Sequence, residues 1–183
     1  MELERTKLPE VIVLTPKKLT DARGFFSETF SEKTWQQAGL HYHFVQDNHT
    51  KSAEKGVVRG LHYQIAPRAQ AKLVRVVHGA ILDVVVDIRR ASPTFGQHVA
   101  FVLSSANWKQ MLVPIGFAHG YVTLEPNSEV QYKVTDFYAP ECERGILWND
   151  PALGIDWGVT PESAQIADRD MKLPHLAVAK DLF

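Results

Sequence analysis

Two of the eight histidines lie in short motifs that could support chemistry. His62 falls within residues 60–64, Gly-Leu-His-Tyr-Gln, and His119 closes the run Pro-Ile-Gly-Phe-Ala-His at 114–119. A neutral imidazole binds divalent metals, and with an ordinary pKa of about 6.5 it also exchanges protons near neutral pH. The first question is therefore whether these two histidines hold a metal or move protons. We interpret the other six as surface or hydrogen-bonded side chains: His41, His43, His49, His78, His98 and His175.

Both motifs resemble those of the cupins, a family of double-stranded jelly rolls. Residues 114–119 are similar to the cupin Pro-x-Gly-x-x-His motif, and the stretch from Gly56 is similar to Gly-x5-His-x-His followed by Glu. Here Gln64 replaces the second His, and Arg68 stands where the Glu is expected. Because a cationic Arg and a missing carboxylate disfavour a divalent metal, we predict no metal and a His62 free for acid/base chemistry. The alternative, a metal-dependent cupin oxygenase, would contain stoichiometric iron or zinc.

Secondary structure must position these motifs, and the sequence predicts short strands over most of the chain. The runs are rich in Val, Ile, Phe and Tyr, and Gly, Pro, Asn, Ser or Asp separates them. This spacing favours an all-β sandwich or barrel, which the cupin motifs narrow to a jelly roll. Gly79 predicts a hairpin turn over 76–80. Alternation over 82–87 places Asp83 and Asp87 on the same face of an apolar strand, where their carboxylates need hydrogen-bonding or charged partners. The predicted strands are 11–14, 25–30, 44–47, 57–61, 72–77, 80–88, 98–103, 110–113, 118–124 and 129–136.

Few helices are expected, and each is short. Ser31 can cap a helix over 32–38 that Gly39 closes, and a second helix is predicted to start near residues 161–162. Beyond 148–151 the pattern thins into turns, but the apolar residues there predict a tail packed on the β body. The chain has no linker, repeat or low-complexity tract, so we predict one cupin-like domain over residues 1–183.

Composition and charge exclude several classes of protein. With 20 Lys+Arg against 21 Asp+Glu the net charge is −1, so no overall basic field attracts nucleic acid or an anionic membrane. A single cysteine, Cys142, rules out an internal disulfide framework and Cys-rich zinc modules. No apolar run is long enough to predict a membrane span or a signal peptide. We therefore expect a cytoplasmic protein.

Segments along nearly the whole chain resemble the dTDP-4-dehydrorhamnose 3,5-epimerases. That family inverts carbons 3 and 5 of dTDP-4-keto-6-deoxyglucose to give the dTDP-4-keto-rhamnose precursor. The resemblance implies a jelly-roll fold, epimerase activity in dTDP-rhamnose biosynthesis, a nucleotide-sugar substrate and no cofactor. The matching segments are 21–28, 46–48, 56–64, 72–76, 83–89, 92–96, 114–120, 132–135 with Tyr138, and 148–151.

Such a reaction needs three kinds of catalytic group. The carbonyl of a 4-keto sugar acidifies the hydrogens on carbons 3 and 5, so inversion requires a base, a stabilised enolate and an acid on the other face. The resemblance assigns the roles to four side chains: His62 as the base, Asp170 as its carboxylate partner, Tyr132 as the proton donor and Lys72 beside the keto oxygen. Two further carboxylates, Asp168 and Asp83, are alternative partners for His62.

Further residues are implied in substrate binding. Arg23 and Arg59 suit a diphosphate, because a guanidinium holds two oxygens at once. Ala167 and Arg169 depart from the family, which commonly has Ser and Lys there. The complete set that the resemblance implies, including the aromatic faces suited to stacking, is Arg23, Phe26, Glu28, Gln46, Asp47, Asn48, Arg59, His119, Tyr138, Glu143 and Arg169.

Two other functions compete with the double epimerase. Related cupins epimerise only carbon 3 or only carbon 5 of a dTDP-4-keto sugar, and a non-catalytic jelly roll could bind nucleotide sugars without turnover. The second predicts that His62, Asp170 and Tyr132 would not all be present, yet they are. The family also implies a homodimer, in which residues 21–28 serve either their own pocket or the partner's.

Overall fold

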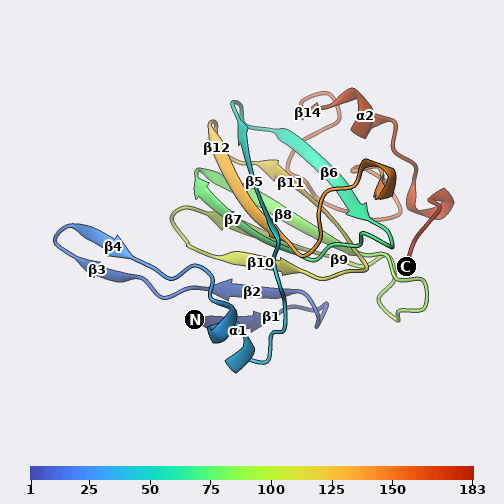
Figure 1. The fold of residues 1–183 in the computed structure, drawn as a ribbon. Coiled ribbons are helices and arrows are strands. Elements are labelled where there is room, and N and C mark those ends of the chain that lie inside the picture. The colour runs from blue at the N-terminus through green and yellow to red at the C-terminus, as the bar shows by residue number, and fades with distance from the viewer.

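Two antiparallel sheets packed face to face form the body of the structure, a computed structural model that describes residues 1–183 (Figure 1). The predicted all-β sandwich with a few short helices and a packed tail is confirmed. The first sheet has the order β1 (Glu2–Arg5), β2 (Ile12–Thr15), β10 (Gln110–Val113), β7 (Lys72–His78), β12 (Ser128–Val134), β5 (Gln46–Ser52). The second has the order β13 (Glu143–Gly145), β6 (Val57–Gln64), β11 (Phe117–Thr123), β8 (Ala80–Asp87), β9 (His98–Ser104), with β14 (Gln165–Ile166) parallel to β6.

The remaining elements lie outside the two sheets. β3 (Leu19–Asp21) and β4 (Gly24–Phe26) form a separate hairpin, which Figure 1 shows projecting from the body as an arm. The helices are α1 (Glu32–Gln37) and α2 (Asp168–Met171), with 3-10 turns η1 (Pro140–Cys142) and η2 (Leu176–Val178). None of them is long and apolar enough to cross a lipid bilayer.

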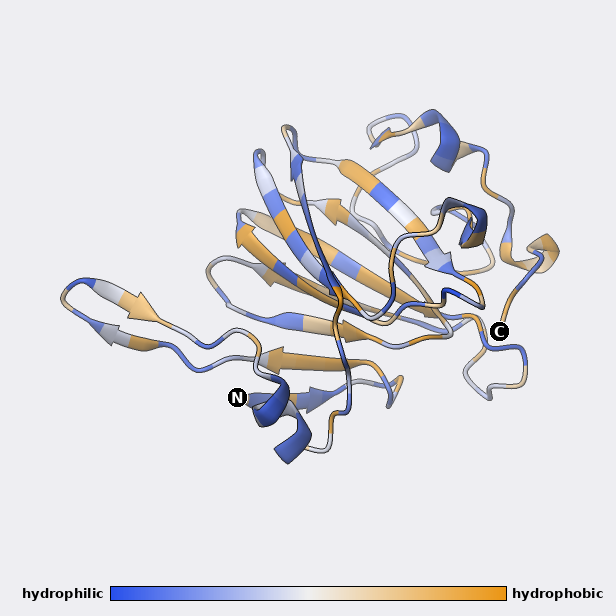
Figure 2. Cartoon of the chain, viewed as in Figure 1, coloured by the Kyte–Doolittle hydropathy of each residue, from blue (hydrophilic) through white to orange (hydrophobic).

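Hydrophobic and hydrophilic residues alternate along several strands (Figure 2). The buried apolar residues form three cores. One core fills the space between the sheets, with Val74 and Met111 from the first sheet against Val85 from the second. The tail covers the outer face of the second sheet through residues such as Trp148 and Trp157. The helix α1 covers part of the first sheet's outer face through Trp35. Burial on both faces explains why β2 and β8 read as nearly continuous apolar runs.

Most predicted strands are present, and the differences have local causes. The strand expected over 25–30 ends at Phe26, and the one expected over 44–47 begins at Gln46 and continues to Ser52. The helix over 32–38 is confirmed, since Ser31 Oγ accepts from the Thr34 N–H. The helix expected near 161–162 is wrong. There, a turn closes between Thr160 and Ser163, and the following residues pair with β6 as β14.

The hairpin predicted over 76–80 is also wrong, because β7 and β8 belong to different sheets. Gly79 turns the chain across the sandwich at a φ of 75°. A Cβ on this glycine would lie 2.5 Å from Ser128 Oγ, so the crossing leaves no room for a side chain. The turn signal was correct, and only the pairing of the two flanking strands was not.

A β-bulge in β6 decides which side chains of that strand share a face. His119 of β11 lies opposite His62, whereas Tyr121 lies opposite Arg59. One residue of β11 therefore faces two of β6, Gly60 and Leu61. Residues three apart would point to opposite faces of a regular strand, and the extra residue brings both Arg59 and His62 to the face turned toward the first sheet.

The bulge depends on the absence of side chains at two glycines. Gly60 has a φ of 113°, and a Cβ there would lie 2.7 Å from Gly120 Cα and 2.7 Å from the His119 carbonyl oxygen. A Cβ on Gly120 would in turn lie 2.7 Å from the Arg59 carbonyl oxygen. These contacts are with backbone atoms, which cannot rotate away.

We predict that Gly60→Ala lowers the free energy of unfolding by much more than the same substitution does at a control glycine. The control is Gly154→Ala, at an exposed glycine with a φ of 58° and no atom within 4 Å of the point that a Cβ would occupy. The control should lose about 1–2 kcal/mol from left-handed backbone strain alone. Gly60→Ala should lose at least about 1–3 kcal/mol more, because the added methyl overlaps backbone. Urea unfolding of both variants measures the difference, and equal losses would show that the bulge does not require glycine.

Candidate active site

A cavity of about 590 Å³ opens between the sheets at the end where β5, β6 and β12 meet the tail. Its wall combines strands of both sheets with residues of β14 and α2. Eleven of the fifteen candidate site residues line it: Gln46, Asn48, Arg59, His62, Lys72, His119, Tyr132, Tyr138, Glu143, Arg169 and Asp170.

The other four candidates lie away from this cavity. Asp47 points to the opposite side of β5, where it pairs with Lys133 at 2.8 Å. Arg23 and Phe26 sit on the projecting arm, where Arg23 pairs with Asp21 at 2.6 Å and Phe26 is 68% exposed. Glu28 follows the arm and accepts a hydrogen bond from Thr34. Within one chain the structure does not bring these side chains to the pocket.

His62 is held by a carboxylate from the tail. Its Nε2 lies 2.8 Å from Asp170 Oδ1, and the Gly60 N–H donates to Asp170 Oδ2 at 3.3 Å. Since a carboxylate only accepts hydrogen bonds, Nε2 carries the proton, and in the neutral ring Nδ1 keeps its lone pair. Burial alone would raise the pKa of Asp170, but the hydrogen bond with His62, the positive charge of that ring when it is protonated and the Gly60 N–H outweigh it and lower the pKa. The bulge thus supplies a free N–H that helps fix the carboxylate.

Lys72 reaches the same region from the first sheet. Its Nζ donates to the His62 carbonyl oxygen at 3.3 Å. Burial lowers the pKa of Lys72 to about 8, and the negative charges of Asp83 and Glu143 oppose that shift. The ammonium is therefore a partly desolvated cation, whose field acts more strongly than in water on a charge that develops beside it.

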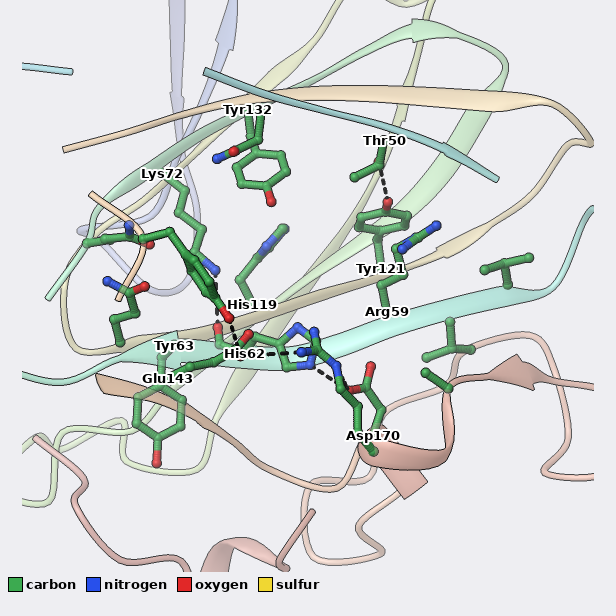
Figure 3. A pocket seen from close by; sticks show the side chains of 18 of the residues that line it. Thr50, Arg59, His62, Tyr63, Lys72, His119, Tyr121, Tyr132, Glu143 and Asp170 are labelled. Carbon is green, nitrogen blue, oxygen red and sulfur yellow. Dashed lines mark hydrogen bonds and ion pairs between the residues drawn. The ribbon is translucent and has the colours of Figure 1, made fainter. Parts of the chain in front are cut away.

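Tyr132 faces His62 from β12 in the first sheet, and Figure 3 shows its hydroxyl directed into the cavity. Burial is the main cause of its raised pKa; Glu143 adds to the effect and Arg59 opposes it. The phenol is consequently protonated at neutral pH. A protonated donor and an imidazole with a free lone pair thus belong to opposite sheets.

Polar side chains join at the rim of the cavity. Glu143 Oε2 accepts from the Tyr138 hydroxyl at 3.0 Å and from Arg169 at 3.3 Å. The hydrogen bond to Glu143 raises the pKa of Tyr138. Gln46 donates to Asn48 at 2.9 Å and accepts from the Tyr138 N–H, which ties β5 to this rim. The rim therefore links residues from β5, β13 and α2.

Neither replaced cupin ligand position supplies a metal donor. The Gln64 amide donates to the carbonyls of Arg68 and Phe137, and its oxygen accepts from the Ala139 N–H. Arg68 pairs with Asp136 at 3.0 Å. Both side chains hold the loop beyond β6, and the two remaining imidazoles each use Nε2 on a carboxylate. This donor set does not fit a divalent metal.

The sequence analysis missed several residues of the cavity wall. Tyr121, 4% exposed, lines it and shares a 2.8 Å hydrogen bond with Thr50 (Figure 3). Period-2 alternation from His119 would have indicated Tyr121, and the same step from Asn48 would have indicated Thr50. The tail residues Gln165 and Ile166 carried no such signal, because their place depends on parallel pairing with β6.

Most of the chain is similar to known proteins. The family model described as dTDP-4-dehydrorhamnose 3,5-epimerase matches residues 5–178. The protein of that name from Shigella flexneri is 48% identical over 172 residues, which cover 93% of each chain.

Solved structures show the same architecture. The epimerase of that name from Bacillus anthracis, with TDP and PPi bound, superposes with a TM-score of 0.92 at 45% identity, covering 95% of this chain and 98% of that one. The dTDP-6-deoxy-D-glucose-3,5-epimerase from Legionella pneumophila, in complex with dTDP-4-keto-L-rhamnose, gives 0.93 at 43% identity, covering 98% and 94%. By the family model, by the relative from Shigella and by the cupin jelly roll that it shares with these structures, this chain belongs to the dTDP-4-dehydrorhamnose 3,5-epimerase family.

Proposed function

We propose that this protein inverts carbons 3 and 5 of dTDP-4-dehydro-6-deoxy-D-glucose to give dTDP-4-dehydro-L-rhamnose in dTDP-rhamnose biosynthesis. One observation carries the proposal: an imidazole paired with a carboxylate and a protonated phenol line one cavity from opposite sheets, with a partly buried ammonium nearby. Inversion requires this arrangement, because the proton leaves one face of the carbon and returns to the other. Relatives at 45–48% identity bear the name of this activity.

The first step is proton abstraction by His62. The Nδ1 lone pair takes the proton from the carbon next to the ketone, so the C–H bond breaks and an N–H bond forms. Asp170 holds the other ring nitrogen at 2.8 Å, which orients the ring and stabilises the imidazolium, as the carboxylate does in catalytic triads. The electron pair of the C–H bond forms the C=C bond of the enolate, and the π pair of the carbonyl moves onto the keto oxygen.

The second step is return of a proton from Tyr132. The enolate oxygen lies beside the Lys72 ammonium, which stabilises the negative charge where it develops. Tyr132 donates its phenolic proton to the opposite face of the carbon, and solvent then restores the protonation states of His62 and Tyr132. The same sequence at the second carbon completes the reaction, with no net oxidation or reduction.

Substrate binding uses the rest of the cavity. Arg59, anchored to Ser52 Oγ and the Lys51 carbonyl at 3.3 Å, is placed for the diphosphate. Gln46 and Asn48 offer donors and acceptors for the base, and Tyr138 offers a face for stacking. The other proposed contacts are His119, Glu143 and Arg169.

We further propose that residues 1–183 act as one domain in a cytoplasmic homodimer, whose arm completes the partner's pocket. The arm exposes Leu19 and Phe25, each 53% exposed, besides Phe26. Apolar side chains on a projecting hairpin are suited to an interface. Arg23 and Glu28, which lie outside their own chain's cavity, would then contact substrate in the neighbouring one. The Asp47 side chain lies on the face of β5 turned away from the cavity, so this orientation does not suit a contact with the substrate in its own chain's cavity.

The single-centre epimerase is the competing function, and deuterium incorporation separates the two. Turnover of dTDP-4-dehydro-6-deoxy-D-glucose in deuterated water, coupled to the reductase that follows, should place one deuterium at carbon 3 and one at carbon 5. NMR of the product counts both labels. Label at one carbon alone would establish a single-centre epimerase, and no label would exclude epimerisation.

We predict that His62→Ala slows deuterium exchange at the sugar carbons at least about 100-fold, the range for loss of a general base. Its affinity for dTDP should stay within about threefold of the wild type, because the ring contacts the sugar rather than the nucleotide. His49→Ala, at an exposed histidine paired with Glu129 on the far side of β5, is the matched control and should keep full exchange. Full exchange in His62→Ala would mean that another group is the base.

Mixing two inactive variants tests the shared pocket. If the arm serves the partner, then a heterodimer of His62→Ala and Arg23→Ala chains has one intact pocket. Random reassociation should then recover about one quarter of wild-type activity, since half of the dimers are mixed and each has one working site. The two variants refolded separately are the controls. No recovery, with heterodimers verified by native mass spectrometry, would show that Arg23 serves its own chain.

A further inference from the structure

Asp83 is a fully buried carboxylate with one oxygen left unpartnered. It lies on β8 with 0% exposure, among apolar residues of the core between the sheets. Its Oδ1 accepts from His119 Nε2, whereas Oδ2 is the single buried side-chain polar atom with no hydrogen-bond partner in the protein. Leaving a buried oxygen without a donor destabilises the fold, so the presence of this carboxylate calls for a function.

Asp87, on the same strand, is a buried carboxylate with a structural role and serves as a comparison. Asp87 is also fully buried, but both of its oxygens are satisfied by the Arg89 guanidinium and the hydroxyls of Ser92 and Thr94. These bonds fix the turn after β8. Asp83 joins no such turn and instead faces the catalytic cavity through His119.

His119 gains a defined tautomer from this contact. Because the carboxylate only accepts, Nε2 carries the proton and Nδ1 is unprotonated in the neutral ring. His119 lines the cavity directly opposite His62 in the β11–β6 register, and its Nδ1 is not buried. Arg59 lies further along β6, opposite Tyr121. His119 is therefore at the sugar end of the pocket rather than the diphosphate end.

Lys72 is the second group that Asp83 influences. The negative charges of Asp83 on β8 and Glu143 on β13 stabilise its ammonium, which donates a hydrogen bond to the His62 carbonyl oxygen of β6. Burial lowers the pKa of Lys72 to about 8, and the charge of Asp83 opposes that shift. One carboxylate thus acts on two groups that line the sugar end of the cavity.

We propose that Asp83 is a positioning residue for the epimerase reaction: it holds His119 as the Nε2–H tautomer with Nδ1 presented to the sugar, and its negative charge favours the ammonium form of Lys72. The cavity then contains two His–Asp pairs, whose histidines lie on the adjacent strands β6 and β11. His62–Asp170 moves the proton, and His119–Asp83 orients the sugar. The proposal rests on the proposed function for its effect on turnover, but the tautomer is independent of that function.

The test is Asp83→Asn, which keeps the shape but removes the charge and lets an amide donate to Nε2. Nitrogen-15 NMR of histidine-labelled protein, with His119→Gln to assign the signal, should show protonated Nε2 in the wild type and a shift toward protonated Nδ1 in the variant. The kcat should fall about 10- to 100-fold, as on loss of an orienting partner behind a functional imidazole. The affinity for dTDP should stay within about threefold, since dTDP lacks the hexose.

The pH profile adds a readout that a purely structural role would not move. In the wild type, kcat/KM should fall above a pH of about 8 as Lys72 loses its proton. Removing the charge of Asp83 lowers the pKa of Lys72 further, so the alkaline limb should move to lower pH. Asp156→Asn, at an exposed turn residue that caps the Gly158 N–H, is the matched control and should change neither readout.

Three results would overturn the proposal. They are protonated Nδ1 on His119 in the wild type, an unchanged tautomer in Asp83→Asn, or a variant whose kcat and alkaline limb equal those of the wild type. The first needs no variant and decides the matter even if Asp83→Asn fails to fold. If the wild type does not exchange sugar hydrogens at all, the proposed function fails, whereas the tautomer and its dependence on Asp83 are still measured.

Discussion

One extra residue in β6 is the constraint on which the pocket depends. A regular strand would turn Arg59 and His62 to opposite faces, and only one of them could reach a ligand between the sheets. The bulge at Gly60 and Leu61 puts both on the inner face and frees the Gly60 N–H from the strand ladder. That N–H then binds Asp170, the carboxylate that orients His62. A single backbone irregularity thereby connects the diphosphate end of the cavity with the base.

The sandwich architecture separates groups that must act from opposite sides. His62 and His119 come from the second sheet, whereas Lys72 and Tyr132 come from the first. Packing between the sheets fixes the distance between these two sets, because interior side chains are close-packed and resist displacement. The outer face of the first sheet is covered in part by α1, and that of the second sheet by the tail. The working side chains are thus supported by a layer of apolar residues behind each sheet.

The strands and the first helix were predictable from alternation and capping, whereas most of the cavity residues were predictable only through the resemblance to a known family. The partner of His62 was open among Asp170, Asp168 and Asp83, because nothing local shows that the tail docks against β6 while Asp83 faces His119. The hairpin at Gly79 failed for a similar reason. A turn residue specifies the bend, but the choice between pairing in one sheet and crossing to the other depends on the packing of the whole sandwich.

The origin of Asp170 in the tail has a consequence for biogenesis. The carboxylate stands 108 positions after His62 in the chain, so a ribosome completes the strands that hold the base long before it makes the group that orients it. Until Trp148, Trp157 and Leu176 dock on the second sheet, α2 has no fixed place and the imidazole has no carboxylate beside it. Synthesis thus supplies the base long before the carboxylate that orients it. A nascent chain arrested before residue 170 would contain His62 without its partner.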